Sequence, residues 1–359
     1  MAVVFGALPE VYTHGFDTVI DVRSPAEFAE DHVPGAINLP ALNNEERARV
    51  GTIYVQDSPF KARKIGAALV AANAARHLQT TLIDKPGGWR PLVYCWRGGQ
   101  RSGSFATILT QIGWRPGLID GGYRTYRRLV VETMHTARLP HQLVLLDGNT
   151  GTAKTEILGH LAAQGIQTLD LEALAGHRGS IFGAGDRKQP SQKAFEGALA
   201  AALNDCDPSM PVVVEAESSK IGQCQIPRAV WQAMCVAPRI TLRAPLNERA
   251  SYLTRTYADI AADTAQLLAI IAHLRRLHGR ERVADWQALA STKQFAQLAR
   301  ELMAHHYDPR YAKSRDRLDS VILGTLNCPS LDPAALSGIA RQIAQTVQTA
   351  PTLTSGGPS

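Results

Sequence analysis

One cysteine of the chain, Cys95, stands where a reactive thiol would be stabilised. An apolar strand pattern at residues 92–94 leads into it, and a helical pattern follows at residues 104–112. The backbone N–H groups of such a strand-to-helix loop lie at the positive end of the helix dipole, where they stabilise an anion or a thiolate. The loop consists of Cys95, Trp96, Arg97, Gly98, Gly99, Gln100, Arg101 and Ser102.

Two glycines and two arginines distinguish this loop from an ordinary strand end. Gly98 and Gly99 allow the backbone to curl around a bound group, and the positive charges of Arg97 and Arg101 lower the pKa of a neighbouring thiol. The alternative is a buried, inert cysteine, which has no use for an arginine-rich glycine loop. We therefore predict that Cys95 is a nucleophile assisted by Arg97 and Arg101.

The other four cysteines lack these surroundings, and we expect them to be structural. Their wide spacing contains no C-x-x-C pair of the kind that binds zinc, and their odd total with Cys95 argues against a disulfide framework. This usage fits a reducing, cytoplasmic compartment best. The four are Cys206, Cys224, Cys235 and Cys328.

A second strand-to-helix loop, after residues 143–146, carries a phosphate-binding pattern. It matches the Walker A form G-x-x-x-x-G-K-[ST], with Ala153 in place of the last glycine. Lys154 and the backbone N–H groups suit phosphate charge, and Thr155 is a candidate Mg²⁺ ligand. The methyl group of Ala153 narrows the space for the phosphates, so the motif by itself does not establish ATP turnover. A strand-to-helix turn without a ligand is the alternative. The predicted phosphate-binding residues are Gly148, Asn149, Thr150, Gly151, Thr152, Ala153, Lys154 and Thr155.

The apolar residues 211–214 and the acidic residue that follows them, Glu215, are typical of a Walker B segment. In that interpretation Glu215 orients water, metal or substrate. A strand-end carboxylate without such a role is an equally good interpretation.

The order of elements predicts an α/β protein with two domains. Short β-branched runs alternate with Ala-rich helical stretches up to about residue 128, and a polar stretch precedes a second alternating segment. Strand signals fade after residues 240–242, and residues 246–314 are predicted to be mostly helical. The predicted parts are a domain at 1–135, a domain at 141–349 with a helical C-terminal extension, and a disordered tail at 350–359.

The composition describes an ordinary globular protein of 359 residues. With 45% apolar and 19% charged residues, the chain can bury a core in each domain and is not expected to be disordered. A net charge of +6 permits an anionic partner without requiring one. Residues 1–8 predict a first strand rather than a signal peptide, and the sequence holds no apolar run of membrane-spanning length.

Two segments near the N-terminus resemble the rhodanese signature. The first holds Asp21 and Arg23 in an Asp-x-Arg stretch, and the second reads HVPGAINLP at residues 32–40. The resemblance implies a rhodanese-like domain in about the first third of the chain, where the family's cysteine carries sulfur. The five residues between Cys95 and Arg101 resemble the longer loop of rhodanese-related phosphatases, which suits a phosphate-like donor. We expect Asp21 and Arg23 to form an ion pair that fixes the fold rather than to catalyse.

Further segments extend the resemblance to nearly the whole chain apart from the tail. They read YCWRGG at 94–99, HRGSIFG at 177–183, QPSQKAFE at 189–196, EAESSKIG at 215–222 and HYDPRY at 306–311. Together they resemble the bacterial tRNA 2-selenouridine synthase family, a rhodanese domain fused to a P-loop domain. The resemblance implies an enzyme acting on wobble 2-thiouridine of the tRNAs for Lys, Glu and Gln. Geranyl diphosphate first geranylates the sulfur, and selenium from selenophosphate then displaces the geranylthio group.

The same resemblance implies roles for the two loops. Cys95 corresponds to the selenium-carrying S-selanylcysteine, while Arg97, Arg101 and the loop amides hold selenophosphate. The loop at 148–155 corresponds to the site for the diphosphate of the geranyl donor, with Mg²⁺ at Thr155 as a candidate. A tightly bound cofactor is not implied.

Four residues outside the loops are predicted to contact substrate: His177, Arg178, Ser180 and Glu215. The first three carry the H-R-G-S pattern of the family and are expected to touch the diphosphate or the wobble base. The alternative for them is a loop stabilised by its own side-chain hydrogen bonds.

The tRNA needs a basic surface and aromatic side chains to bind it. Candidates for phosphate contacts in the helical segment are Arg275, Arg276, Arg280 and Arg282, although a solvated helix face explains them equally well. Trp96, Tyr123 and Tyr126 are candidates for stacking on a base, but core packing is the better interpretation for each. A membrane partner is not expected, and the chain is expected to act as a monomer.

Two other functions remain open at this point. One is a sulfurtransferase or C-x5-R phosphatase fused to a small-molecule kinase. The other is a binding module without catalytic activity, in which both loops are degenerate.

Overall fold

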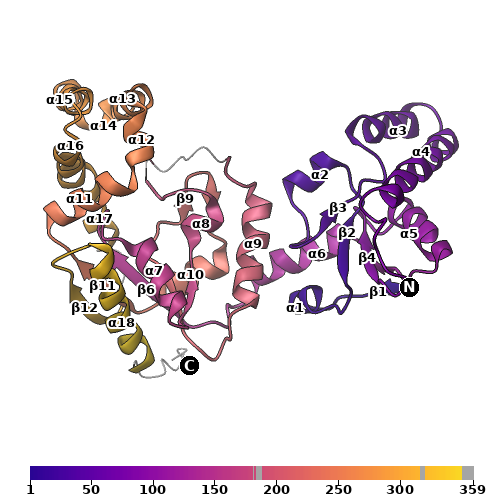
Figure 1. The fold of residues 1–359 in the computed structure, drawn as a ribbon, viewed down its shortest axis with the longest axis horizontal. Coiled ribbons are helices and arrows are strands. Elements are labelled where there is room, and N and C mark those ends of the chain that lie inside the picture. The colour runs from indigo at the N-terminus through magenta and orange to yellow at the C-terminus, as the bar shows by residue number, and fades with distance from the viewer. Residues whose placement is uncertain (181, 183–187, 316–319, 350–359) are drawn as a thin grey trace. The chain divides into compact units, whose positions relative to one another are not determined.

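The computed structural model describes residues 1–180, 182, 188–315 and 320–349, and in these ranges the chain folds as two compact units (Figure 1). The first comprises Met1–Arg138 and Pro190–Asn204, and the second comprises Leu139–Gln189 and Asp205–Ser359. The prediction placed residues 190–204 in the second domain, whereas in the structure they pack with the first unit. The predicted tail at 350–359 lies outside the described residues.

The first unit is built on a parallel sheet of five strands in the order β1-β5-β4-β2-β3. Asp21, the last residue of β2, pairs with Tyr94, the last residue of β4. The sheet therefore brings the rhodanese-like Asp-x-Arg stretch and the Cys95 loop to the same edge. The strands are β1 (Ala2–Val3), β2 (Thr18–Asp21), β3 (Ile37–Asn38), β4 (Pro91–Tyr94) and β5 (Gly117–Ile119).

Local signals in the sequence explain where the helices of this unit begin and end. Asn43 and Glu46 form a capping box before α3, the Ser58 side chain accepts a hydrogen bond from the Lys61 amide at the start of α4, and α5 ends at Gly113 in the left-handed conformation. The helices are α1 (Leu8–Tyr12), α2 (Pro25–Glu30), α3 (Asn44–Gln56), α4 (Pro59–Gln79), α5 (Gln100–Ile112), α6 (Tyr123–Val131), the π-helix η1 (Glu132–Thr136) and α9 (Gln192–Asn204).

Helix α9 is joined to the first unit by buried charge. Glu196 of α9 is 3% exposed and forms an ion pair with Arg127 of α6, and its other oxygen lies 3.1 Å from Nε2 of His135. Lys193 forms an ion pair with Glu30 at 2.6 Å. These contacts link segments far apart in the sequence, which is why the sequence pattern did not predict where α9 packs.

The second unit also contains a parallel five-stranded sheet, in the order β12-β11-β6-β8-β7, and a separate antiparallel pair, β9 and β10. Strand β12 was not predicted, because as an edge strand it is largely exposed and contains a glycine. The strands are β6 (Leu143–Gly148), β7 (Gln167–Leu169), β8 (Val212–Glu215), β9 (Lys220–Ile221), β10 (Cys224–Gln225), β11 (Arg239–Arg243) and β12 (Ile322–Asn327).

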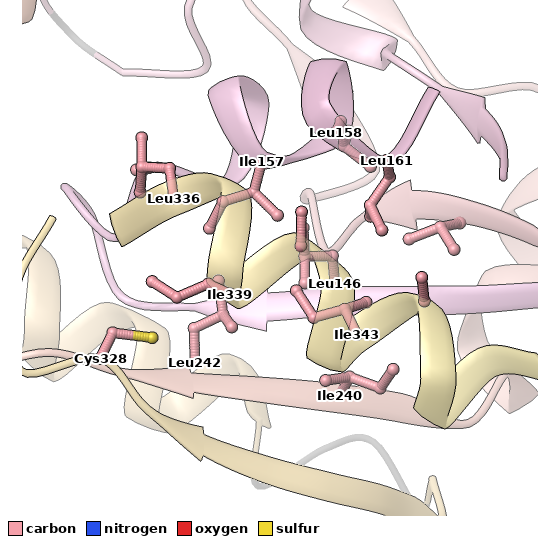
Figure 2. Packing of buried hydrophobic residues seen from close by; sticks show 14 of the residues in the cluster. Leu146, Ile157, Leu158, Leu161, Ile240, Leu242, Cys328, Leu336, Ile339 and Ile343 are labelled. Carbon is pink, nitrogen blue, oxygen red and sulfur yellow. The ribbon is translucent and has the colours of Figure 1, made fainter. Parts of the chain in front are cut away.

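Two helices, α7 and α18, pack on one face of this sheet around a continuous apolar core (Figure 2). Leu146 of β6 and Ile240 of β11 contribute from the strands, Ile157 and Leu161 from α7, and Ile343 from α18. This core anchors α7 directly behind the predicted phosphate loop. The first helices of the unit are α7 (Lys154–Ala163), α8 (Leu171–Ala175) and α10 (Arg228–Val236), and the last is α18 (Pro333–Thr349).

The predicted helical segment at 246–314 is confirmed. Its helices enclose a second apolar cluster around the fully buried Trp286. Within the described ranges, no helix combines the length and hydropathy needed to cross a membrane. The helices are α11 (Leu246–Thr256), α12 (Ala258–Ala262), α13 (Thr264–Ala272), α14 (Arg275–His278), α15 (Arg280–Ser291), α16 (Phe295–Leu302), the π-helix η2 (Met303–Tyr307) and α17 (Asp308–Arg315).

Ile343→Ala should destabilise the second unit. The side chain is fully buried between α18 and the sheet, and removing a buried aliphatic group of this size costs about 2–5 kcal/mol. Gln342→Ala, on the exposed side of the same helix, should stay within about 0.5 kcal/mol of the unchanged protein. Chemical unfolding, followed by a probe in the second unit, measures both; equal stabilities would contradict the packing in Figure 2.

Candidate active sites

The sulfur of Cys95 is held by hydrogen bonds at the end of β4. The backbone amide of Gly99 donates to Sγ at 3.2 Å, and the hydroxyl of Ser102 donates to it at 3.1 Å. Ser102 lies in the first turn of α5, which begins at Gln100. The strand, loop and helix N-terminus predicted around Cys95 are therefore present, and they converge on the thiol.

The surroundings of Cys95 favour the thiolate. Burial alone would raise the pKa, but hydrogen bonds from the side chain and amide of Ser102 and from the amide of Arg97, together with the charge of Arg101, lower the pKa of Cys95 below its ordinary value. Burial raises the pKa of each of the other four cysteines. All five are free thiols, and the one predicted to be reactive is the one whose thiolate is stabilised.

The two arginines of the loop differ in their surroundings. Arg101 is half-buried, and its guanidinium nitrogens lie 2.8 and 3.4 Å from the carboxylate oxygens of Glu27. Arg97 is exposed. The Glu27 carboxylate offsets part of the charge of Arg101, so Arg97 presents the less compensated charge to an incoming anion. Sequence reasoning missed Glu27, which follows the Asp-x-Arg stretch by four residues and gave no signal of its own.

A second glycine turn supports the loop from behind. The amide of Tyr123 donates to the carbonyl of Cys95 at 2.8 Å. Gly122 has φ +61°, and a Cβ there would collide with the carbonyl oxygen of Cys95 and the amide nitrogen of Gly98. Only glycine fits this close approach. The half-buried Trp96 stacks on Tyr123, with ring centroids 5.2 Å apart.

Asp21 and Arg23 form the ion pair that was predicted. Nη2 of Arg23 lies 2.6 Å from a carboxylate oxygen of Asp21 and also donates to the carbonyl of Asp31 at 2.6 Å. Both side chains are at most 2% exposed. The pair thus joins β2 to the end of α2, which is a contribution to the fold rather than to catalysis.

The phosphate loop connects β6 to α7, as predicted. Nζ of Lys154 donates to the carbonyl of Gly148 at 3.0 Å, and Oγ1 of Thr155 donates to Glu172 at 3.1 Å. Ala153, the residue in the place of the usual glycine, adopts φ 60° and ψ 27°. A residue with a Cβ is strained in this left-handed conformation. Ala153 also belongs to the apolar core. The presence of alanine instead of glycine therefore affects backbone strain and core packing as well as the space for phosphate.

Arg249 of α11 fastens the phosphate loop to the helical segment. Its Nη1 donates to the carbonyl of Thr150 at 3.1 Å, and its guanidinium binds both carboxylate oxygens of Asp308 at 2.9 and 2.7 Å. Gly151 has φ +83°, and a Cβ there would contact the Arg249 backbone and Leu253. Sequence reasoning missed Arg249, although its partner Asp308 lies in the HYDPRY segment.

A cavity of about 550 Å³ opens at the phosphate loop. Lys154 lies in it, 5.6 Å from the ring centre of Tyr311, and Glu217 and Glu172 also line it. The cavity is bordered by four lysine or arginine side chains and four carboxyl side chains, with Lys154 next to Thr155 at the start of α7. The predicted site residues that line it are Thr150, Gly151, Thr152, Ala153, Lys154, Thr155, Arg178 and Ser180; Gly148, Asn149, His177 and Glu215 do not.

Three glutamates around Lys154 have raised pKa values. Burial, followed by repulsion between neighbouring carboxylates, raises the pKa of Glu217 to about 7 and that of Glu215 to about 9. Burial also raises the pKa of Glu172, against the attraction of Lys154. Protonated carboxyl groups reduce the repulsion that a phosphate would meet here. No group of three or more metal-binding side chains occurs within the described ranges, so an ion at Thr155 would need ligands from phosphate and water.

Glu215 ends β8, as the sequence predicts, and it does not line the cavity. Its side chain is fully buried, and Oε2 accepts a hydrogen bond from the amide of Leu171 at the start of α8. The structure gives it a role in positioning α8, and Glu217, two residues further on, is the carboxyl group that reaches the cavity. The Walker B pattern located the strand end correctly, and a contact of Glu215 with substrate stays a prediction.

His177 and Ser180 make local hydrogen bonds of the kind considered as the alternative for this loop, whereas Arg178 contacts a distant segment. Nδ1 of His177 accepts from the amide of Gly179 at 3.1 Å, and Oγ of Ser180 accepts from the amide of Phe182 at 3.2 Å. Arg178 binds Asp259 at 3.1 and 2.8 Å. Arg178 and Ser180 nevertheless line the cavity, so the contact with substrate remains a prediction for these two.

The candidate tRNA contacts divide into exposed and buried residues. Tyr123 and Tyr126 are 3% and 1% exposed, which confirms the interpretation that they pack in the core. Trp96 is half-buried and retains part of its ring surface. The basic residues Arg275, Arg276, Arg280 and Arg282 are all exposed on α14 and α15.

Ser102→Ala should make Cys95 less reactive. Removing the hydroxyl donor destabilises the thiolate, because a hydrogen bond to a charged group contributes about 1.5–3 kcal/mol, so the thiol pKa should rise by about one unit or more. Ser104→Ala, on the exposed side of α5, is the control. Alkylation of the Cys95 peptide by iodoacetamide, followed by mass spectrometry across pH, measures the change. Identical pH profiles for the two variants would contradict this account of the loop.

Binding of inorganic diphosphate at the phosphate loop should weaken as pH rises through about 7. Below this value Glu217 is protonated; above it, the carboxylate adds negative charge beside Lys154. Glu217→Gln should lack the part of the pH dependence that comes from Glu217. Because the diphosphate itself titrates equally in both experiments, the difference in affinity between the two proteins isolates the contribution of Glu217. Calorimetry between pH 6 and 8 should find a difference on the order of tenfold between the two proteins at pH 8. Parallel pH dependences would show that Glu217 does not titrate in this window.

Two family models match the chain in the order that the two units suggest. The model for the Rhodanese-like domain matches residues 10–129, and that for the tRNA 2-selenouridine synthase AAA domain matches residues 141–272. The first match contains the Cys95 loop, and the second contains the phosphate loop. Together they confirm the α/β fold class, a rhodanese-like domain followed by a P-loop-like domain.

Proteins named tRNA 2-selenouridine synthase are similar to this chain over much of its length. The one from Hahella chejuensis is 35% identical over 250 residues, and the one from Nitrosomonas europaea is 37% identical over 243; each match covers 67% of this chain and 63% of the relative. The chain thus spans slightly less than two thirds of these two relatives. The one from Alcanivorax borkumensis is 33% identical over 337 residues, which cover 85% of this chain and 91% of the relative. On this evidence, the chain belongs to the tRNA 2-selenouridine synthase family.

Proposed function

We propose that the chain is an enzyme that converts wobble 2-thiouridine to 2-selenouridine in the tRNAs for Lys, Glu and Gln. Its family and its two anion-binding loops support this proposal. The observation that carries it furthest is the thiolate-stabilising environment of Cys95, in a chain that also has a lysine-bearing phosphate loop. Each loop suits one phosphate-bearing donor, selenophosphate for the first and geranyl diphosphate for the second.

In the first step, the thiocarbonyl sulfur attacks the first carbon of geranyl diphosphate. A carbon–sulfur bond forms, the bond from that carbon to the diphosphate oxygen breaks, and diphosphate leaves with the electron pair. Lys154 and the loop amides stabilise the charge of the leaving group. Glu172 and Glu217 line the same cavity, and their raised pKa values limit the negative charge that opposes diphosphate binding.

Alkylation prepares the base for the second step. Sulfur leaves poorly from the thiocarbonyl group, whereas a geranylthiolate is a competent leaving group. The thiolate of Cys95 takes selenium from selenophosphate: a selenium–sulfur bond forms, and the selenium–phosphorus bond breaks with its electron pair on phosphorus, which leaves as phosphite. The carried selenium then attacks the same carbon of the base, a carbon–selenium bond forms, and the carbon–sulfur bond breaks as geranylthiolate leaves with the electron pair. A cellular thiol supplies the two electrons that cleave the selenium–sulfur bond and restore the cysteine. Cys95 is assigned the selenium-carrying S-selanylcysteine position. Arg97 and the amides of the loop hold the phosphate group of selenophosphate, while Arg101, paired with Glu27, contributes a partly compensated charge.

The other proposed ligands follow from the chemistry of the donors. Thr155 supplies an oxygen atom of the kind that Mg²⁺ prefers, and Mg²⁺ commonly completes its shell with substrate phosphates and water. Bound there, the ion would supply positive charge to the diphosphate. A tightly bound cofactor is not part of the proposal. The exposed arginines of α14 and α15 are the proposed contacts for tRNA phosphates, and the protein is proposed to act in the cytoplasm as a monomer.

Cys95→Ala should abolish selenation of 2-thiouridine tRNA while leaving geranylation and tRNA binding largely intact, because only the selenium-carrying atom is lost. Cys206→Ala, which removes a half-buried thiol of raised pKa, is the control and should leave both steps intact. Nucleoside mass spectrometry after incubation with each donor separates the steps. Selenation that survives Cys95→Ala would refute the role of this residue, and rapid hydrolysis of a generic phosphoester by the unchanged protein would favour the phosphatase alternative.

A further inference from the structure

A second cavity adjoins the phosphate-loop cavity and has a different character. Its volume is about 90 Å³, and it lies among α11, α12, α13, α16 and η2. Ten of its fifteen described lining residues have apolar side chains, among them Leu253, Leu267, Leu298, Ala299 and Met303. The cavity beside it is lined by charged side chains, among them Lys154 and three glutamates. We call the apolar one the chain cavity.

The two cavities are continuous along one side. Thr150 of the phosphate loop lines both of them, and so do Ser180, Leu253, Tyr257 and Tyr307. A molecule whose phosphates contact the loop at Thr150 can therefore extend directly into the chain cavity. Its extending part must be apolar, because the deep walls at Leu267 and Leu298 are apolar and at most 5% exposed.

The polar groups of the chain cavity are poorly placed to read a nucleotide base. Oγ of Ser180 lies 3.2 Å from the hydroxyl of Tyr257, and Oγ1 of Thr254 donates to the carbonyl of Ala250 at 2.9 Å. Among the described lining residues, none has an amide, carboxylate or cationic side chain. A purine would bury its ring nitrogens and exocyclic groups here without side-chain amide or charged partners, which is costly. A hydrocarbon has no such requirement.

We propose that the chain cavity binds the isoprenoid chain of the donor whose diphosphate occupies the phosphate loop. This inference rests on the proposed function, and it adds a binding subsite formed by the helical segment. It also assigns a function to the helices from α11 to α16. They supply an apolar wall, which a site for a nucleotide alone does not require. Arg249 fastens this wall to the loop through the carbonyl of Thr150.

The subsite predicts how affinity depends on chain length. Burial of each methylene contributes roughly a fourfold gain in affinity. Inorganic diphosphate should therefore bind most weakly, dimethylallyl diphosphate more tightly and geranyl diphosphate most tightly, with a total gain on the order of 100-fold after the loss of chain flexibility. Calorimetric titration of the full chain with these three probes measures the series.

Ala299→Phe is the variant that tests the location of the subsite. Ala299 lines the chain cavity, so a larger side chain fills it; Ala296→Phe, on the exposed side of the same helix, is the matched control. The first should reduce the advantage of geranyl diphosphate over inorganic diphosphate to within about threefold, with diphosphate binding itself unchanged. Ala261→Leu, paired with the exposed Ala262→Leu, repeats the test on α12 in case Ala299→Phe does not fold.

Two results would overturn the inference. The first is an unchanged affinity for geranyl diphosphate in folded Ala299→Phe and Ala261→Leu proteins. The second is a loss of affinity for ATP in these variants without a loss of affinity for geranyl diphosphate, which would show that the cavity binds a nucleotide base. The proposed function is measured separately in the same preparations, by geranylation of 2-thiouridine tRNA. If the unchanged chain geranylates tRNA but the cavity variants bind the donor normally, only the subsite is wrong; if it forms no geranylated tRNA, the proposed function itself fails.

Discussion

Both candidate sites depend on one constraint, the sharp turn from a buried parallel strand into the N-terminus of a helix. The turn leaves backbone N–H groups without helical partners, and these groups converge on whatever occupies the loop. In the first unit the amide of Gly99 donates to the sulfur of Cys95, and the hydroxyl of Ser102 adds a second hydrogen bond. In the second unit the backbone N–H groups form the loop ahead of Lys154, anchored by the core that α7 and α18 share with the sheet. The same backbone physics thus prepares the chain for two different anions.

Charge around each loop is balanced rather than maximised. Glu27 offsets Arg101 beside the thiol, and glutamates with raised pKa values surround Lys154. A strongly positive site would bind anionic products as firmly as substrates. Because carboxylates offset part of the positive charge, the backbone amides and one or two cations hold the donor. Protonation of Glu217 is expected to make phosphate binding depend on pH near neutrality. The chain cavity then adds an apolar contribution that a free diphosphate product lacks.

Local patterns in the sequence predicted the α/β fold, the helical segment, both loops and the Asp21–Arg23 pair, because each is encoded by neighbouring residues. Contacts between distant segments were not predictable in this way. Glu27 reaches Arg101 across 74 positions, Arg249 reaches the loop across 99, and α9 packs with the first unit through Arg127 and Glu196. Glu217, which lines the cavity, was not predicted, because the Walker B pattern points to the strand end at Glu215, two residues earlier.

The most direct test of the central claim is the nucleoside content of tRNA from cells that lack 2-selenouridine and then receive this chain. Selenium and 2-thiouridine tRNA must both be available to the cells. The account predicts that 2-selenouridine appears in the tRNAs for Lys, Glu and Gln with the unchanged chain, and not with the Cys95→Ala variant. Persistence of 2-thiouridine alone with the unchanged, folded protein would contradict it.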